Sequence, residues 1–242
     1  EPSVQMNAQD MARRLLKDGE LVQVSSKRGT ILLPVQASVE VGLSQAFIAM
    51  HWGEEYLSGL SATGTPLAGV NALTTSTFCP SAKQPELKHA AVKIVKADLP
   101  WSLLAVAWLP DDEALAAREQ LKALMKVFPF TSCVPFSNNT PLQTSATAPD
   151  QVRRERNGLL FRASAHEAPP PEVLATLERL LGLDGADALH YADRNKGQRR
   201  TMRLVRSTEG QAELTGFVLA GDTRAEAWIT TLLKDELPAQ TY

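Results

Sequence analysis

The pattern of the sequence changes at Asp98–Pro100, and this change constrains the fold more than any other feature. Before it, short apolar runs alternate with turns that contain Gly, Ser and Pro, and helical periodicity is scarce. After it, apolar strands alternate with amphipathic segments. Many short strands with few helices favour a small β-barrel. We therefore expect a mixed protein in two parts, a β-barrel over residues 1–98 and a smaller α+β domain over residues 99–242.

A β-hairpin is the clearest local signal of the first part. Leu21–Ser25 alternates apolar and polar residues like a half-buried strand. Lys27–Gly29 then supplies a turn into a second strand at Thr30–Val35. Two further short elements, Phe47–Met50 and Ala91–Val95, have strand character and complete the half. The first part is thus predicted to consist mainly of strands.

A short helix is predicted to precede the hairpin, over Asn7–Lys17. Its apolar residues Met11, Leu15 and Leu16 fall on one face at helical spacing. Asp18-Gly19 is typical of a turn and marks the end of the helix.

The second part alternates strands with helices. Thr223 and Glu226 have the spacing of a capping box, which would begin a last helix that runs to Leu233. Ser137–Asp150 is rich in Pro, Ser, Thr and Asn and is typical of a surface loop. In chain order we expect a strand at Leu103–Trp108, a helix over 112–127, a strand at Leu159–Phe161, a helix at Pro171–Leu181 and a hairpin of Met202–Val205 with Leu214–Ala220.

Composition excludes several classes of function. The net charge is −2, whereas nucleic-acid and membrane-surface binding require a basic excess. No apolar run approaches the roughly 20 residues that span a bilayer. The two cysteines, Cys79 and Cys133, are too few for a Cys-rich zinc or iron–sulfur site. A disulfide between them is possible, but nothing in the sequence requires it. A reducing cytoplasm is the simpler interpretation.

The segment Asn71–Ile94 is the strongest candidate for a ligand site. It is a long irregular loop rich in amide, hydroxyl and amino groups, which suits a large polar ligand better than a core. An amide such as Asn71 or Gln84 can pair in both directions with a heterocycle that presents adjacent donors and acceptors. Lys88 can place a positive charge on a pyrophosphate. His51 and Trp52 offer an imidazole edge and a flat apolar face.

Each of these residues also has an ordinary interpretation. Asn71 suits a turn or a helix cap, Lys88 and Gln84 suit a solvated loop, and His51-Trp52 suits packing at a strand end. No triad spacing, shared histidine spacing or Gly-rich phosphate loop is present, so we predict no catalytic residue and no metal ligand in this chain.

Several motifs, in the right order, resemble the C-terminal domain of molybdopterin-guanine-dinucleotide oxidoreductases. The first three are Val4–Ala12, Lys17–Val24 and Ser26–Gly29. Asn71–Thr74, 81–88 and Ala91–Ile94 are similar to the closing cofactor-binding segment of nitrate reductases in that group. The resemblance implies a double-psi β-barrel that caps the cofactor, molybdopterin guanine dinucleotide with molybdenum. It favours Asn71 and Lys88 as cofactor contacts, with Gln84, His51 and Trp52 beside them.

Motifs in the second part of the chain point to one group within this family. Tyr191–Asp193, Gly197–Arg200 and Gly216–Thr223 resemble the extension that follows the barrel in bacterial assimilatory nitrate reductases. The resemblance implies reduction of nitrate to nitrite. It also places the molybdenum ligand and the iron–sulfur clusters outside this chain, so we expect the chain to be a C-terminal part that is inactive without the N-terminal catalytic domains of the same enzyme.

Alternatives remain open. The barrel would equally suit another molybdopterin oxidoreductase, such as a formate dehydrogenase or a periplasmic nitrate reductase, although the extension argues against both. The isolated chain could instead be a binding or assembly module without activity. Finally, Arg199, Arg200, Arg203 and Arg206 suggest a basic strand face, either solvated or able to dock an acidic redox partner protein.

Overall fold

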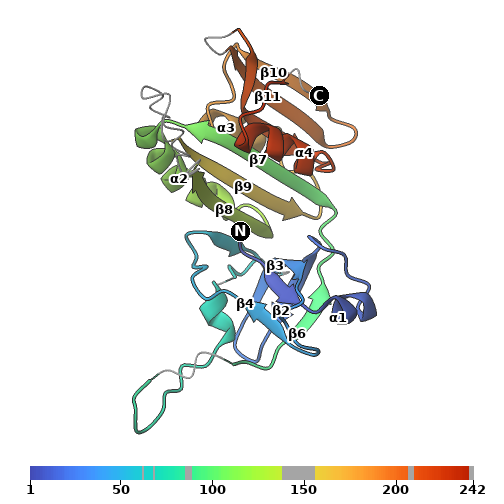
Figure 1. Ribbon diagram of the computed structural model, residues 1–242, viewed down its shortest axis with the longest axis vertical. Coiled ribbons are helices and arrows are strands. Elements are labelled where there is room, and N and C mark those ends of the chain that lie inside the picture. The colour runs from blue at the N-terminus through green and yellow to red at the C-terminus, as the bar shows by residue number, and fades with distance from the viewer. Residues whose placement is uncertain (62, 68, 85–88, 138–155, 207–209, 240–242) are drawn as a thin grey trace, which may run out of the picture. The chain divides into compact units, whose positions relative to one another are not determined.

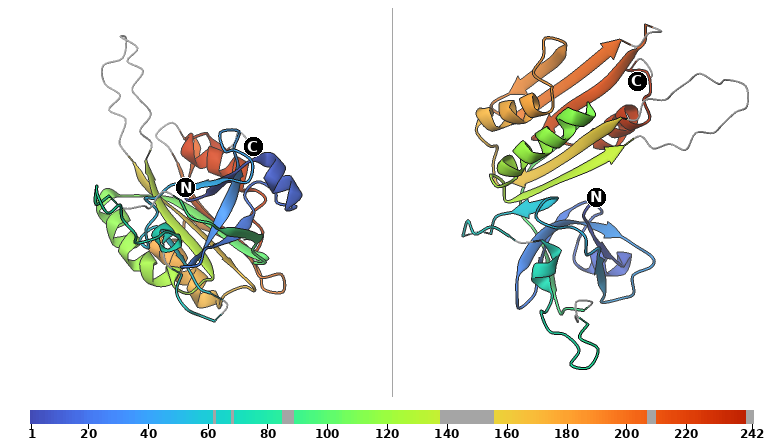
Figure 2. Two further views of the ribbon diagram at one scale, coloured as in Figure 1. Left: turned by 90° about the horizontal axis from the view of Figure 1, so that it is seen from below. Right: turned by 90° about the vertical axis from the view of Figure 1, so that its left-hand side faces the viewer.

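The structure is a computed structural model that describes residues 1–61, 63–67, 69–84, 89–137, 156–206 and 210–239. The chain folds into two compact units, which Figures 1 and 2 colour by residue number. The first unit comprises Glu1–Trp101, Lys122–Cys133 and Arg162–Glu167. The second comprises Ser102–Leu121, Val134–Phe161 and Ala168–Tyr242. The loop expected at Ser137–Asp150 lies, apart from Ser137, outside the described residues.

A five-stranded sheet forms the centre of the first unit, in the order β4-β1-β3-β2-β6. Its strands are β1 (Val4–Met6), β2 (Leu21–Ser25), β3 (Thr30–Ala37), β4 (Ala46–Ile48) and β6 (Lys93–Lys96). The expected hairpin is confirmed, because β2 pairs antiparallel with β3 from Leu21↔Pro34 to Ser25↔Thr30. β1 lies parallel to β3. The sheet is open, with β4 and β6 at its edges, and none of the sheets in the described part of the chain is closed. The double-psi β-barrel is therefore not confirmed.

The core of the first unit follows from the alternation of its strands. Val22 and Val24 are buried whereas Gln23 between them is exposed, and Ile31 and Leu33 on β3 are likewise buried. Burying such side chains stabilises the fold by roughly 1.5–3 kcal/mol each. Residues from other strands and from a short 3₁₀ helix complete this core: Leu57, Val70, Leu73 and Phe130.

The first helix, α1 (Ala8–Arg13), is shorter than expected. Asn7 caps its N-terminus by accepting a hydrogen bond from the Gln9 N–H at 3.0 Å. The helix ends where the Leu16 N–H bonds to the Met11 carbonyl and Leu15 takes a left-handed φ of 55°. This turn buries Leu16 and leaves Leu15 85% exposed. The buried positions of Met11 and Leu16 are thus confirmed, and that of Leu15 is wrong.

A second sheet has seven strands in the order β10-β11-β12-β7-β9-β8-β5. Its strands are β5 (Leu57–Gly59), β7 (Trp101–Leu109), β8 (Phe130–Ser137), β9 (Asn157–Ala165), β10 (Ala188–Asp193), β11 (Gln198–Arg206) and β12 (Ala212–Ala220). The helices are α2 (Asp111–Met125), α3 (Pro171–Leu180) and α4 (Glu226–Lys234). The expected strands, helices and β11–β12 hairpin are confirmed.

In the second unit, α3 and α4 lie on opposite faces of the sheet (Figure 2). α4 packs Ile229 and Leu233 against the buried residues Phe217 and Leu219 of β12. The expected last helix is present, but it begins only at Glu226 and the capping box is wrong. Ala225 is the N-cap without a side-chain bond, and the Thr223 hydroxyl lies 3.2 Å from the Ser102 hydroxyl instead.

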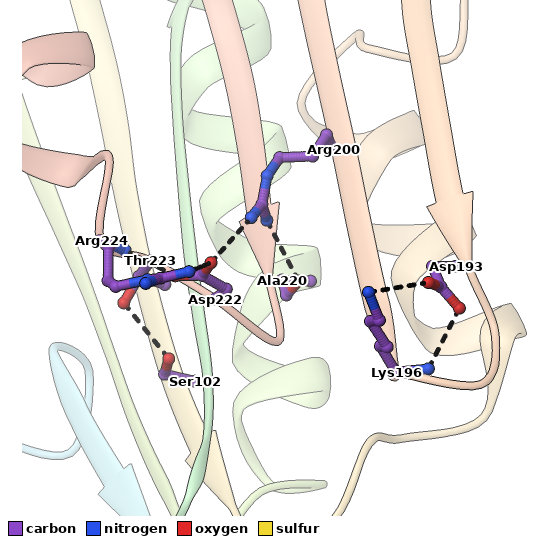
Figure 3. A network of polar contacts seen from close by, with 8 residues as sticks. All are labelled: Ser102, Asp193, Lys196, Arg200, Ala220, Asp222, Thr223 and Arg224. Carbon is purple, nitrogen blue, oxygen red and sulfur yellow. Dashed lines mark hydrogen bonds and ion pairs between the residues drawn. The ribbon is translucent and has the colours of Figure 1, made fainter.

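The arginines of β11 do not form one basic face, because successive strand residues point to opposite sides. Arg199 binds the buried carboxylate of Glu178 on α3. Arg200 faces the other way and lies 3.4 Å from Asp222 (Figure 3). Hydrogen bonds from the Arg224 side chain and backbone, with the charges of Arg224 and Arg200, hold the pKa of Asp222 well below its usual range.

The structure also bears on membrane spanning and on the two cysteines. Within the described residues, no helix is both long and apolar enough to cross a membrane. Cys79 and Cys133 are both free thiols, so the disulfide left open by the sequence is not formed.

Candidate functional site

The motif Val4–Ala12 builds one wall of a groove through two side chains of α1. Asn7 donates from its amide nitrogen to the Val41 carbonyl at 3.1 Å, while its oxygen caps the helix. Asp10 is 2% exposed, and its carboxylate accepts the Ser44 N–H at 2.5 Å. Ser44 has a left-handed φ of 61°, a conformation that costs a non-glycine residue about 1 kcal/mol. The two bonds therefore hold the segment between Val41 and Ser44 in a shape that it would not adopt alone.

The groove itself has a volume of about 930 Å³. It is lined by Gln5 on β1, by side chains between Glu40 and Phe47, and by His89–Val92. Amide, hydroxyl, imidazole and carboxylate groups share this lining with the ring of Phe47, which is 54% exposed. The volume of this groove is near the upper end of the range for ordinary ligand sites. A groove of that size with a few polar groups beside apolar ones suits a large heterocyclic ligand.

A second feature of the first unit is a tightly packed support beneath Asn71. Asn71 lies on the short 3₁₀ helix η1 (Val70–Leu73), which is anchored by its buried end residues and leaves the Asn71 side chain exposed. Gly29 packs against this helix so closely that a Cβ would lie 2.8 Å from the Ala72 carbonyl oxygen. On the other side, the Val70 N–H donates to the Trp52 carbonyl at 3.3 Å.

This packing brings together residues that are distant in sequence. The neighbours of Asn71 on η1 make these contacts, Ala72 with Gly29 of the turn Ser26–Gly29 and Val70 with Trp52. Ser26 holds the turn, because its hydroxyl accepts the N–H groups of Arg28 and Gly29 at 3.0 and 3.3 Å. Lys27 and Arg28 are both exposed, with no ion pair to another described residue. They supply two positive charges in the turn whose Gly29 packs against Ala72 of η1.

Of the predicted aromatic pair, His51 is exposed and Trp52 is half-buried. Their rings lie 4.7 Å apart at 46°, and Trp52 also meets Tyr56 edge-on at 5.8 Å. Trp52 packs against the core of the first unit, so the ordinary packing role holds for it. The His51 side chain is exposed to solvent beside the Trp52 ring.

None of the predicted contacts that the structure describes, Asn71, Gln84, His51 and Trp52, is among the residues that line the groove. Gln84 is exposed, and its carbonyl accepts the Cys79 N–H at 2.8 Å, which closes a small turn in the segment that extends away from the sheet in Figure 1. Lys88 lies outside the described residues. The residues that follow it, His89–Val92, line the groove. Hydrogen bonds from the backbone N–H groups of Ala82 and Ser81 lower the pKa of the Cys79 thiol in that turn.

Sequence reasoning missed the groove residues Gln5, Glu40 and Gln45, as well as the cations Lys27 and Arg28. Gln5 and the two cations had a signal, since they lie inside motifs that the resemblance had already selected. No group of three or more His, Cys, Asp or Glu side chains arranged for a metal ion occurs among the residues that the structure describes.

Comparison with known proteins agrees with the chemistry of this unit. Residues 1–91 match the protein family described as Molydopterin dinucleotide binding domain. The chain is 31% identical over 93 residues to F420-dependent formate dehydrogenase 2 subunit alpha of Methanococcus maripaludis, which is 38% of this chain and 12% of that protein. It is 39% identical over 69 residues to a nitrate reductase of Synechocystis sp., which is 28% of this chain and 8% of that protein.

These matches span only a small fraction of the curated relatives. They support a molybdopterin cofactor-binding domain of the molybdopterin oxidoreductases in the first part of the chain.

Proposed function

We propose that this chain is the cofactor-binding C-terminal part of an assimilatory nitrate reductase, working with the catalytic domains of the same enzyme in the cytoplasm. The observation that carries the proposal is the coincidence of the family match over residues 1–91 with the large polar groove of the same unit. The cofactor we assign is molybdopterin guanine dinucleotide with molybdenum.

The residues present fit such a cofactor. Pterin and guanine both carry an edge with adjacent N–H donors, and the carboxylate of Glu40 at the groove can accept two of them. Glu40 has no ion pair among the described residues that would compete for its carboxylate. The cofactor's pyrophosphate needs positive charge, which the exposed Lys27 and Arg28 of the turn against η1 would supply.

The work of this chain is binding and orientation. When bound, the molybdenum centre supplies the two-electron chemistry of nitrate reduction. Asp10 and Asn7 hold the groove wall through their bonds to Ser44 and Val41, so the polar groups around them stay in place before the cofactor arrives. Phe47 and Val92 cover an apolar part of the lining and keep water from that side of the ligand.

The substrate can be tested by assembling the complete enzyme from this chain and its catalytic domains. We expect nitrate reduction with reduced methyl viologen as the electron donor. Formate oxidation by the same preparation, without nitrate reduction, would favour the second candidate, a formate dehydrogenase, which the 31% identity to a formate dehydrogenase subunit supports. Neither activity, with full cofactor content, would favour a binding or assembly module.

Replacing Lys27 and Arg28 together with Gln is expected to lower the retention of cofactor by about tenfold or more, because each charged hydrogen bond contributes roughly 1.5–3 kcal/mol. Smaller losses are expected for Asn71→Ala and Lys88→Ala. The measurement is pterin and molybdenum content per enzyme after gel filtration. Lys17→Gln, an exposed lysine of the same unit, is the control and should retain the cofactor. If the double variant kept its full pterin and molybdenum content, Lys27 and Arg28 would not be cofactor contacts.

A further inference from the structure

Strand β10 is an open edge of the seven-stranded sheet (Figure 1). Its central residues are exposed, including Leu189 at 63% and Tyr191 at 56%. Both lie on the same face, since successive odd residues of a strand point the same way, and that face includes Met202, the cross-strand partner of Leu189. The strand contains no Lys or Pro, the residues that usually protect an edge from further pairing.

The pairing of β10 with β11 decides which backbone N–H and C=O groups of β10 point away from the sheet. The Ala188 N–H donates to the Gly185 carbonyl at 3.1 Å, in the turn before the strand, and so does not bond to β11. In an antiparallel strand, the N–H and C=O of one residue point to the same side, and the side alternates along the strand. Leu189 and Tyr191 therefore bond to β11, while His190 and Ala192 direct their N–H and C=O groups outward from the sheet.

These outward groups fit a second copy of the same strand. If His190 pairs with His190 of the second copy about a two-fold axis, the Ala192 N–H of each copy meets the Ala188 carbonyl of the other, while the Ala188 N–H keeps its bond to Gly185. In this register Leu189 lies opposite Tyr191 of the second copy, and the contact occurs twice. Such pairs in the non-hydrogen-bonded position have close side chains and stabilise a sheet by roughly 0.2–1 kcal/mol each.

The neighbouring registers are less favourable. A shift of two residues in either direction keeps the backbone bonds but places Asp193 of the second copy opposite Leu189, or Asp187 of the second copy opposite Tyr191. Either shift pairs a carboxylate with an apolar side chain. Only the symmetric register about His190 matches apolar with apolar at both positions.

We propose that β10 is a self-association edge, through which two copies of this chain pair antiparallel about His190 and join their sheets into one. A foreign strand could use the same backbone groups, but the double Leu189–Tyr191 match is specific to a second copy. This surface belongs to the second unit, whereas the residues assigned to the cofactor belong to the first.

A cysteine trap tests the register. His190→Cys, in a Cys79→Ser background, should form a disulfide-linked dimer on mild oxidation, because hydrogen-bonded antiparallel pairs have Cα atoms about 5.5 Å apart, within disulfide range. Ala192→Cys alone should cross-link at least tenfold more slowly, since Ala192 meets Ala188 and not itself. A mixture of the Ala188→Cys and Ala192→Cys chains should recover cross-linking. Equal rates for all of these, or no dimer for His190→Cys, would overturn the proposal.

Sedimentation of the full 242-residue chain gives a second, independent test. Leu189→Lys and Tyr191→Lys should each raise the dissociation constant of the dimer at least tenfold. Leu115→Lys on α2 is the matched control, because Leu115 is 65% exposed, and it should leave the dimer unchanged. We expect a dissociation constant of about 0.1 μM for the dimer. A wild-type chain that stays monomeric at about 100 μM, a thousandfold above that constant, would also overturn the proposal.

Discussion

Replacing Glu178 with Ala is expected to lower the free energy of unfolding of the second unit by about 3 kcal/mol. Glu178 is 1% exposed on α3, and its carboxylate accepts hydrogen bonds from the Arg199 guanidinium and the Thr201 hydroxyl on β11. Removing it leaves a largely desolvated cation without its carboxylate and leaves the buried Thr201 hydroxyl with only the His190 Nδ1 at 3.2 Å as a partner. The lower end of the range for broken buried pairs applies, because the Arg199 side chain is 25% exposed and can reach water.

The measurement is urea unfolding followed by circular dichroism. Glu172→Ala, an exposed carboxylate in the first turn of the same helix, is the control and should cost less than about 1 kcal/mol. The double variant Glu178→Leu with Arg199→Met should be more stable than Glu178→Ala, since an apolar pair of similar size leaves no unpaired charge. Equal costs for Glu178→Ala and Glu172→Ala would show that the buried pair contributes nothing to stability.

Replacing Asp10 with Ala is expected to destabilise the first unit by about 2 kcal/mol and to lower the retention of cofactor in the complete enzyme. The Ser44 N–H loses its part-buried bond to a buried carboxylate, and the left-handed Ser44 backbone loses the contact that holds it. The groove wall then relaxes toward ordinary backbone angles, and the lining residues around Ser44 move with it. Urea unfolding of the chain and pterin content of the enzyme measure the two effects.

Asp18→Ala is a matched control for Asp10→Ala. Asp18 also accepts a backbone N–H, that of Ala37 at 2.7 Å, but it is exposed and water can replace it. We expect a cost below about 1 kcal/mol and unchanged cofactor content. Adding Ser44→Gly to Asp10→Ala should recover part of the stability, because glycine adopts the left-handed angle freely. If Asp10→Ala retained cofactor as well as Asp18→Ala does, the groove wall would not take part in binding.

The strands and helices of this chain could be predicted from periodicity because the signal is local. Val22 and Val24 alternate with Gln23, and Leu174 and Leu177 recur at helical spacing, so their burial follows from the sequence alone. Leu15 was misplaced because one backbone turn with φ 55° changes the direction of the chain, and a leucine gives no warning of it. The closed barrel was expected from resemblance and was not confirmed, since strand periodicity does not specify which edges meet.

The candidate site was harder to predict because it depends on distant contacts. Asp10 and Ser44 are separated by 34 residues, and neither has a local pattern that links it to the other. Asn71 was selected by its motif, and the structure adds the supports that hold its helix. Lys27 and Arg28 could have been selected in the same way, because they belong to the motif Ser26–Gly29.

The close approach of Gly29 to Ala72 has a consequence for the entropy of binding. Because two backbone segments touch directly, the distance between the turn and η1 does not depend on side-chain rotamers. A ligand that bridges the Asn71 amide and the cations of the turn therefore meets groups whose supports are already ordered, and only the long Lys27 and Arg28 side chains lose freedom. Each immobilised side chain of that kind costs roughly 0.5–1.5 kcal/mol, so a rigid backbone beneath them spares the larger cost of ordering a loop.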